Sequence, residues 1–195
     1  HVPVLEPADS QECYDYFKYA PQLSETLDMP VIVRLTTRIS HARGFVALGD
    51  QVENFEKDYE KQPAKYIMMP GYARGRKVDL LKRIAAAKKL SDSTELNRIE
   101  AGDGKVGVIC SGVCYQYVKE ALPHASILKL GMVYPLPEQK IRDFAASVEK
   151  LYVVEELEPY IQRYVESLGI ECIGDQVFGK AGELSANLVR QVVEG

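Results

Sequence analysis

The stretch K-V-G-V-I-C-S-G-V-C-Y, residues 105–115, decides the fold class. An apolar run ends there in a Ser-Gly turn and gives way to an amphipathic segment, as in a buried strand followed by a helix. The pattern recurs downstream. Strands are predicted at 106–110, 126–130, 151–154 and, more briefly, 170–173. Helices are predicted at 112–122, 137–148, 159–168 and 183–193. This alternation predicts an α/β fold, with a three-layer, mainly parallel sheet covered by helices on both faces.

The sequence of residues 1–44 predicts one helix followed by one strand. Asp9 followed by Glu12 is a capping-box pattern, in which the glutamate reaches back to the cap, and the apolar residues behind it recur at three- and four-residue steps. Pro21 removes one backbone hydrogen bond, at a cost of ~3 kcal/mol in a helix interior, so we expect a kink or a break there. The run from Val31 to Leu35 then predicts a buried strand.

The predicted strand at 31–35 needs neighbours that the adjacent sequence does not supply. We expect residues 1–44 not to join the sheet of residues 105–195 as an ordinary strand. Instead the strand would pair with the apolar run at 66–69, self-associate or stay disordered. Deleting residues 1–44 would then leave the rest of the chain folded and more monomeric.

Residues 45–104 lose the regular pattern and predict a connector with some structure, including a basic amphipathic helix after Gly75. One interpretation of its many lysines and arginines is a surface for nucleic acid or phosphate. The interpretation that we favour is the solvated side of a docked helix. Its apolar face would consist of Val78, Leu81, Ile84 and Ala85.

Composition excludes several classes of function. The formal net charge is −4 and the pI is about 5.5. The overall electrostatic field of the chain therefore does not attract nucleic acid or an anionic membrane. Apolar runs span only a few residues, and the first residues lack the basic start of a signal peptide. Of the four cysteines only Cys110 and Cys114 are close in sequence, so we predict reduced thiols, no metal or iron–sulfur cluster, and a cytoplasmic protein.

Two strand-to-helix turns are candidate sites, and each has a simpler structural explanation. The turn at Ser111 and Gly112 leaves N–H groups free for an anion, or else Ser111 only caps the next helix. Glu155 and Glu156 follow a strand, where α/β proteins often place functional groups, or else they stabilise the start of the next helix.

Two further features are weaker candidates. Arg38 and His41 lie in a basic stretch. One interpretation is a binding site for the anionic tail of a substrate or cofactor, and the alternative is a surface loop. The sequence Gly102-Asp103-Gly104 matches the start of a thiamine-diphosphate motif, but the next asparagine is Asn187, so the motif is incomplete. We therefore predict a turn before a strand at this position.

Five stretches together resemble one family. They are L-E-P-A-D-S-Q-E at 5–12, R-L-T-T-R-I-S-H at 34–41, N-R-I-E-A-G-D-G-K-V-G-V-I-C-S-G-V at 97–113, L-K-L-G-M-V-Y-P-L-P at 128–137 and L-Y-V-V-E-E-L-E-P-Y at 151–160. Their order and spacing across nearly the whole chain resemble the alpha subunit of indolepyruvate:ferredoxin oxidoreductase, a thiamine-diphosphate-dependent enzyme.

The resemblance implies that residues 1–44 are the C-terminal end of a thiamine-diphosphate pyrimidine-binding domain. It implies that residues 105–195 are a transketolase C-terminal-like domain, after the connector at 45–104. The parent would oxidatively decarboxylate aryl 2-oxo acids to acyl-CoA and reduce ferredoxin. It would use thiamine diphosphate, magnesium and 4Fe–4S clusters, with coenzyme A as cosubstrate.

By the same resemblance, the cofactor ligands lie outside this chain. We therefore expect no cofactor and no catalytic residue within it, and a scaffolding role without activity of its own. Its partners would be the rest of the alpha subunit, the beta subunit, ferredoxin and further copies of itself. The alternative is a freestanding α/β assembly module that binds a nucleotide or another anion at Ser111 and Gly112.

Overall fold

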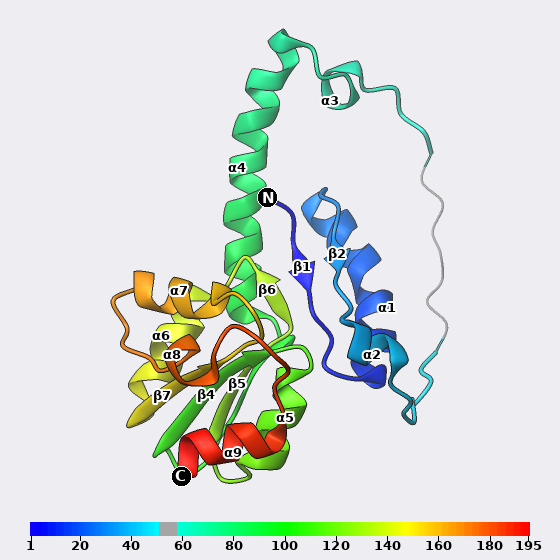
Figure 1. Ribbon diagram of the computed structural model, residues 1–195. Coiled ribbons are helices and arrows are strands. Elements are labelled where there is room, and N and C mark those ends of the chain that lie inside the picture. The colour runs from blue at the N-terminus through cyan, green and yellow to red at the C-terminus, as the bar shows by residue number, and fades with distance from the viewer. Residues whose placement is uncertain (51–57) are drawn as a thin grey trace.

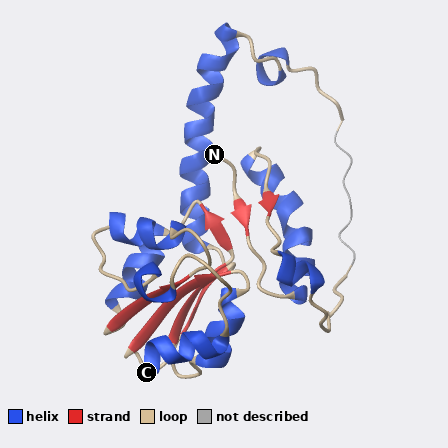
Figure 2. Cartoon of the chain, viewed as in Figure 1, coloured by secondary structure: helices blue, strands red, loops and turns tan. Residues whose placement is uncertain are grey.

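A four-stranded sheet forms the centre of the C-terminal part of the chain (Figures 1 and 2). The computed structural model describes residues 1–50 and 58–195. The sheet has the strand order β3-β5-β4-β7. Its strands are β3 (Asn97–Glu100), β4 (Val106–Ser111), β5 (Ser126–Leu130) and β7 (Lys150–Val154). Because β4 runs parallel to both β5 and β7, and only β3 is antiparallel, the predicted mainly parallel sheet is confirmed.

Helices cover both faces of this sheet. Alternate residues of each strand point to opposite faces, so Val108 and Tyr152 belong to one apolar core and Ile109 and Val153 to another. On the first face lie α5 (Cys114–Ala121), α8 (Asp175–Phe178) and α9 (Ala186–Glu194). On the second lie α6 (Glu138–Ala146) and α7 (Tyr160–Ser167). The three-layer α/β fold is therefore confirmed, although the strand predicted at 170–173 is only a single bridge between Tyr152 and Ile173.

The sheet begins earlier than the sequence indicated. Residues 97–100, which the sequence placed in the connector, form the edge strand β3. Asn97 is fully buried and fixes this strand in place. Its Oδ1 accepts hydrogen bonds from the backbone N–H groups of Gly131 and Met132, at 3.0 and 2.9 Å, and its Nδ2 donates to the Ser91 carbonyl at 3.0 Å.

A second, three-stranded sheet joins the N-terminal segment to the C-terminal part of the chain. It has the order β2-β1-β6, with β1 (Val4–Leu5), β2 (Ile32–Val33) and β6 (Met132–Tyr134). Residues 1–44 thus stay out of the four-stranded sheet, but β1 pairs with a strand of the C-terminal part. The pairing expected between 31–35 and 66–69 was wrong, because β1 supplies the neighbour, while α3 (Pro63–Tyr66) ends where the expected strand would begin.

Helix α1 (Ser10–Leu27) covers this second sheet. Asp9 caps the helix by accepting from the N–H of Glu12 at 2.8 Å, as predicted. Glu12 does not reach back to the cap residue, because its carboxylate accepts from the N–H of Ala8 at 2.7 Å and faces Lys129. Of the kink or break expected at Pro21, the break was wrong: the helix continues through Pro21, which is exposed, while the opposite face of the helix is buried.

A buried ion pair links α1 to the central strand β5. Lys129 is fully buried, and its Nζ donates to Glu12 Oε2 at 2.5 Å and to the Tyr16 hydroxyl at 2.6 Å. Arg98 of β3 donates to the other oxygen of Glu12 at 2.8 Å. Apolar contacts follow the same path, because one core cluster joins Leu5 and Tyr16 to residues of α4 and β6. Residues 1–44 therefore share a core with the C-terminal part.

The long helix α4 (Pro70–Ser93) begins before Gly75 and extends away from both sheets, with α3 near its outer end (Figure 1). Its inner half packs on the body of the protein through Leu80, Ile84, Ala87 and Leu90. The predicted apolar face was wrong except for Ile84, since Val78, Leu81 and Ala85 are exposed. Among the described residues, no helix combines the length and the apolar character that crossing a membrane requires.

Candidate functional site

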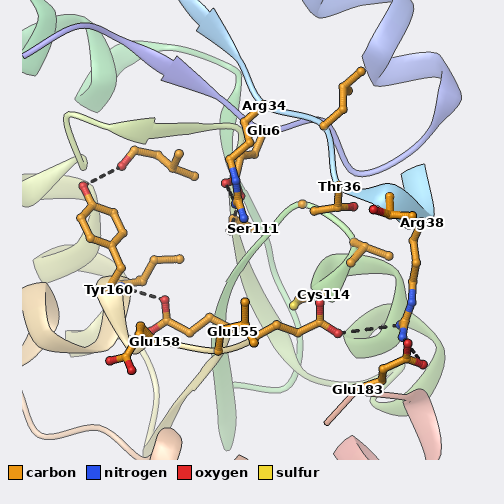
Figure 3. Close-up of a pocket in the computed structure, with 18 of the residues that line it drawn as sticks. Glu6, Arg34, Thr36, Arg38, Ser111, Cys114, Glu155, Glu158, Tyr160 and Glu183 are labelled. Carbon is orange, nitrogen blue, oxygen red and sulfur yellow. Dashed lines mark hydrogen bonds and ion pairs between the residues drawn. The ribbon is translucent and has the colours of Figure 1, made fainter. Parts of the chain in front are cut away.

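A cavity of about 800 Å³ lies at the carboxyl ends of β4 and β7 (Figure 3). From β4 the chain passes through α5 to β5 on one side, whereas β7 lies on the other side of β4. The loops after β4 and β7 therefore leave the sheet in opposite directions. Such a topological switch point is where open α/β sheets bind ligands.

The N-terminal segment forms the opposite wall of the cavity. Glu6 follows β1, and residues 34–38 connect β2 to the short helix α2 (Thr37–His41). Thr36 caps α2, since its side chain accepts from the N–H of Ile39. All five stretches that carry the family resemblance contribute to the wall. One residue from each is Glu6, Thr36, Ser111, Val133 and Glu155.

The turn after β4 holds a carboxylate of the chain itself (Figure 3). Ser111 Oγ donates to Glu6 Oε2 at 2.9 Å, and Arg34 donates to the other oxygen of Glu6. Gly112 has a φ of 51°, and a Cβ there would lie 3.4 Å from Glu6 Oε2. Ser111 is not the N-cap of α5, which begins at Cys114. Glu6 therefore lies where the sequence suggested an external anion.

The two glutamates after β7 have different partners. Glu155 accepts hydrogen bonds from the backbone N–H groups of Ile161 and Gln162, both at 2.8 Å, and so satisfies the first turn of α7. Burial raises the pKa of Glu155, although these hydrogen bonds oppose the shift. Glu156 accepts from the N–H of Leu184 at 3.2 Å. Both carboxylates thus hold loops of the chain in place.

Of the two residues in the basic stretch, only Arg38 lines the cavity. Its guanidinium lies 2.7 Å from a carboxylate oxygen of Glu183 and 3.8 Å from one of Glu156, and it donates to the Leu184 carbonyl at 3.2 Å. Figure 3 shows this cluster at the edge of the cavity. His41 is exposed at the end of α2 and does not line the cavity.

The lining is acidic and contains no activated nucleophile. Five glutamates face two arginines: Glu6, Glu155, Glu156, Glu158 and Glu183 against Arg34 and Arg38. Burial raises the pKa of the Cys114 thiol to about 12, so this cysteine is not a thiolate near neutral pH. The arrangement suits binding and positioning rather than covalent catalysis.

Sequence reasoning found five of the lining residues and missed Glu6. The missed glutamate follows the apolar pair Val4–Leu5, just as Glu155 follows Val153 and Val154. A glutamate directly after an apolar strand was therefore an available signal. It was hidden because β1 is only two residues long.

The described residues contain no cluster of metal-ligating side chains, and the Gly-Asp-Gly stretch is held by backbone packing. No group of three or more His, Cys, Asp or Glu side chains within 1–50 and 58–195 could hold a metal ion. The carboxylate of Asp103 accepts from the N–H of Lys105 at 3.0 Å. A Cβ at Gly102 would lie 2.3 Å from the His124 carbonyl oxygen, so close backbone packing requires this glycine. Gly102–Gly104 is thus a tightly packed loop before β4, as predicted.

Comparison with curated proteins gives a consistent result, although no protein-family model matches the chain. The chain is 37% identical to the indolepyruvate oxidoreductase subunit IorA of Archaeoglobus fulgidus, over 92% of this chain and 29% of that protein. It is 35% identical to IorA of Pyrococcus horikoshii, over 100% of this chain and 32% of that protein. The chain is homologous to a segment of the IorA subunit. It spans about a third of the length of these relatives.

Solved structures agree on the fold. A 2-oxoglutarate:ferredoxin oxidoreductase from Magnetococcus marinus matches 98% of this chain and 41% of its own, with a TM-score of 0.67 at 15% identity. A split-gene transketolase matches 99% of this chain and 56% of its own, with a TM-score of 0.51 at 13% identity. The chain therefore shares its mixed α/β fold with a 2-oxoacid oxidoreductase and a transketolase, in agreement with the transketolase C-terminal-like fold that the family resemblance implied.

Proposed function

We propose that this chain is a segment of the alpha subunit of an indolepyruvate:ferredoxin oxidoreductase. The parent enzyme oxidatively decarboxylates aryl 2-oxo acids to acyl-CoA and reduces ferredoxin. One observation carries the proposal: five stretches that are far apart in the sequence, each resembling this family, meet in the wall of a single cavity. Matches of 32–38% identity to six IorA subunits support the same assignment.

In this proposal, residues 1–44 end a thiamine-diphosphate pyrimidine-binding domain. The region 45–104 connects it to a transketolase C-terminal-like domain. Strand β3, at the end of this connector, pairs with β5 and so belongs to the sheet of that domain. Thiamine diphosphate, magnesium and the 4Fe–4S clusters bind in other parts of the parent, and coenzyme A acts as cosubstrate. The beta subunit and ferredoxin are its partners.

The segment contributes orientation rather than chemistry. The pairing of β1 with β6 and the Lys129–Glu12 ion pair fix the two walls of the cavity relative to each other. Glu6, Ser111 and Arg34 then join the walls at the cavity itself. Because catalytic groups must be held in a precise geometry, a segment that fixes two cofactor-bearing regions relative to one another supports turnover without touching the reacting atoms. Alone, it has no activity.

The test is made on the complete alpha subunit with its beta subunit. We expect indolepyruvate to reduce ferredoxin in a reaction that depends on coenzyme A. We also expect Glu6→Ala to lower kcat/KM by roughly tenfold, because Arg34 and Ser111 lose their shared acceptor. Glu138→Ala is the matched control, since this half-exposed glutamate pairs with Arg142 of its own helix and does not line the cavity.

Two results would overturn the proposal. One is the absence of turnover with every aryl 2-oxo acid tried in the intact, metal-loaded enzyme. The other is turnover by the isolated 195-residue chain, which would mean that the segment itself carries the catalytic groups.

A further inference from the structure

A short loop, residues 179–183, forms part of the cavity wall, and we call it the flap. All of its residues are exposed, and they form neither helix nor strand. Gly182 and Glu183 line the cavity. The flap runs between two buried side chains, Phe178 and Leu184, that belong to the same apolar core. It is therefore a loop that is anchored at both ends and exposed between them.

The sequence of the flap, G-K-A-G-E, contains no large apolar side chain. A segment without buried apolar contacts opens at a low cost in free energy. Gly179 has a φ of 76° and Gly182 a φ of 91°, values that favour glycine. Among the described residues, no atom lies within 4 Å of a Cβ added at either position, so close packing does not explain these glycines. Lys180 pairs locally with Asp175 of α8, at 3.1 Å. The two glycines are thus placed to act as hinges.

Arg38, from the opposite wall, holds the flap in place (Figure 3). Its guanidinium lies 2.7 Å from a carboxylate oxygen of Glu183 and donates to the Leu184 carbonyl at 3.2 Å. Glu156 strengthens this contact, because it accepts from the N–H of Leu184 at 3.2 Å. The Glu183 side chain is 85% exposed, and ion pairs in solvent contribute little stability. The contact between Arg38 and Glu183 is therefore a latch that separates readily.

Cys114 borders the same part of the cavity. It lines the cavity, is 5% exposed, and packs in the apolar core that contains Phe178 and Leu184. Burial raises the pKa of its thiol to about 12, so the thiol reacts slowly while the flap is in place. Entry of water would lower this pKa toward its ordinary value and increase the thiolate fraction. The reactivity of Cys114 therefore reports whether the cavity is open.

We propose that the flap gates the cavity and that Arg38 is its latch. With Arg38 on Glu183 the cavity is closed on this side. When the pair separates, rotation about Gly179 and Gly182 moves Glu183 away from the wall and admits small molecules. Each group of the latch contacts another part of this same chain, so the gate is complete within the described residues.

The test measures how fast a methanethiosulfonate reagent labels Cys114 in the complete alpha subunit with its beta subunit, with the labelled peptide identified by mass spectrometry. We expect Arg38→Met to raise this rate by about fivefold, the effect of losing an exposed ion pair and one hydrogen bond. Arg142→Met is the matched control and should leave the rate unchanged. Its guanidinium also pairs with a glutamate and donates to a carbonyl, Glu138 and Leu168, both at 3.0 Å, but it does not line the cavity.

Two further variants keep the test decisive if Arg38→Met does not fold. Glu183→Gln changes an exposed side chain and should raise the labelling rate of Cys114 at least about twofold, because the amide keeps a hydrogen bond but loses the charge. Gly182→Ala leaves the latch intact but strains the closed flap, since a φ of 91° disfavours alanine, and it should also raise the rate.

Cys110 is the internal reference, because it is fully buried in the strand that precedes Cys114 and should stay unlabelled in every variant. The proposal is overturned if the folded latch variants label Cys114 no faster than the wild type, or if Arg142→Met speeds labelling equally. It is also overturned if Cys110 is labelled together with Cys114, which indicates local unfolding of the core. The gate does not rest on the oxidoreductase assignment, which the turnover assay tests separately.

Discussion

Replacing Lys129 by methionine is expected to destabilise the protein strongly. The side chain is fully buried, and its Nζ donates to Glu12 Oε2 at 2.5 Å and to the Tyr16 hydroxyl at 2.6 Å. Methionine has a similar length but no charge and no donor. The variant therefore leaves the Glu12 carboxylate, whose side chain is only 11% exposed, without its closest cation.

The magnitude follows from what remains around Glu12. Removing one partner of a buried ion pair costs about 3–5 kcal/mol. Here Arg98 at 2.8 Å and the N–H of Ala8 at 2.7 Å still stabilise the carboxylate, so we expect the low end, about 3 kcal/mol. For a chain of this size, each kcal/mol lowers the melting temperature by about 2–4 °C, which gives a decrease of roughly 6–12 °C.

Urea unfolding followed by circular dichroism measures this change. Lys119→Met is the matched control, because the Lys119 side chain is 53% exposed and its ion pair with Glu100 should contribute less than about 1 kcal/mol. The double variant Glu12→Gln with Lys129→Met should recover part of the loss, since no unpaired charge then remains. If Lys129→Met is no less stable than the control, the buried pair does not join the two parts of the chain.

Three further outcomes are expected. Burial alone would raise the pKa of Glu12, but the ion pair with Lys129 outweighs burial, so the pKa is lowered in the folded protein. The stability that this pair contributes is therefore fully present above about pH 4.5, the pKa of Glu12 in the unfolded chain. It is lost as the pH falls through the lower pKa of Glu12 in the folded protein. The urea concentration at the unfolding midpoint should therefore decrease as the pH is lowered below about 4.5. This decrease should be smaller in Glu12→Gln, which has no carboxylate to protonate at this position. Glu155→Ala should cost about 1–2 kcal/mol in thermal unfolding, because two N–H groups of α7 lose their acceptor. Deleting residues 1–44 should abolish folding, contrary to the expectation from the sequence, because this segment shares a core with the C-terminal part and supplies the counter-ion of Lys129. A truncated chain that stays folded would contradict the shared core.

The central sheet was predictable because its signals are local. Strands β4, β5 and β7 are mostly apolar and lie between helices whose apolar residues recur at helical spacing. Strand β3 was not predictable in this way. Its sequence, N-R-I-E, is mostly polar, and it lies at the edge of the sheet, where Ile99 is half exposed. Its position depends on Asn97, whose Oδ1 accepts from the backbone of Gly131 and Met132, 34 and 35 positions away.

Helix α4 shows where periodicity fails. It carries apolar residues on two faces, one built from Leu80, Ile84 and Ala87 and the other from Val78 and Leu81. A single sequence cannot say which face is buried, because both satisfy the helical spacing. The choice was made by tertiary contacts with α1 and the second sheet.

The candidate site was predictable in position but not in role. Five of the six candidate residues line one cavity, since the ends of parallel strands meet at one edge of a sheet. Their partners come from distant parts of the chain. Ser111 and Glu6 are 105 positions apart, and the Arg38 guanidinium is held by a glutamate of the last loop. From the sequence alone, these side chains could have bound a ligand. In the structure, Ser111, Arg38 and the two glutamates bind other parts of the same chain.

The N-terminal segment explains why the described parts of the chain pack as one unit. Its strand at 32–33 seemed to lack neighbours, because the neighbour, β1, has only two residues and gives no periodic signal. Through β1 the segment reaches β6, and through Glu12 it neutralises a lysine that would otherwise be a lone charge in the core. A piece that supplies the counter-ion of a buried lysine cannot move independently of the sheet that carries the lysine. The cavity between them therefore has walls that are fixed by the core beneath it.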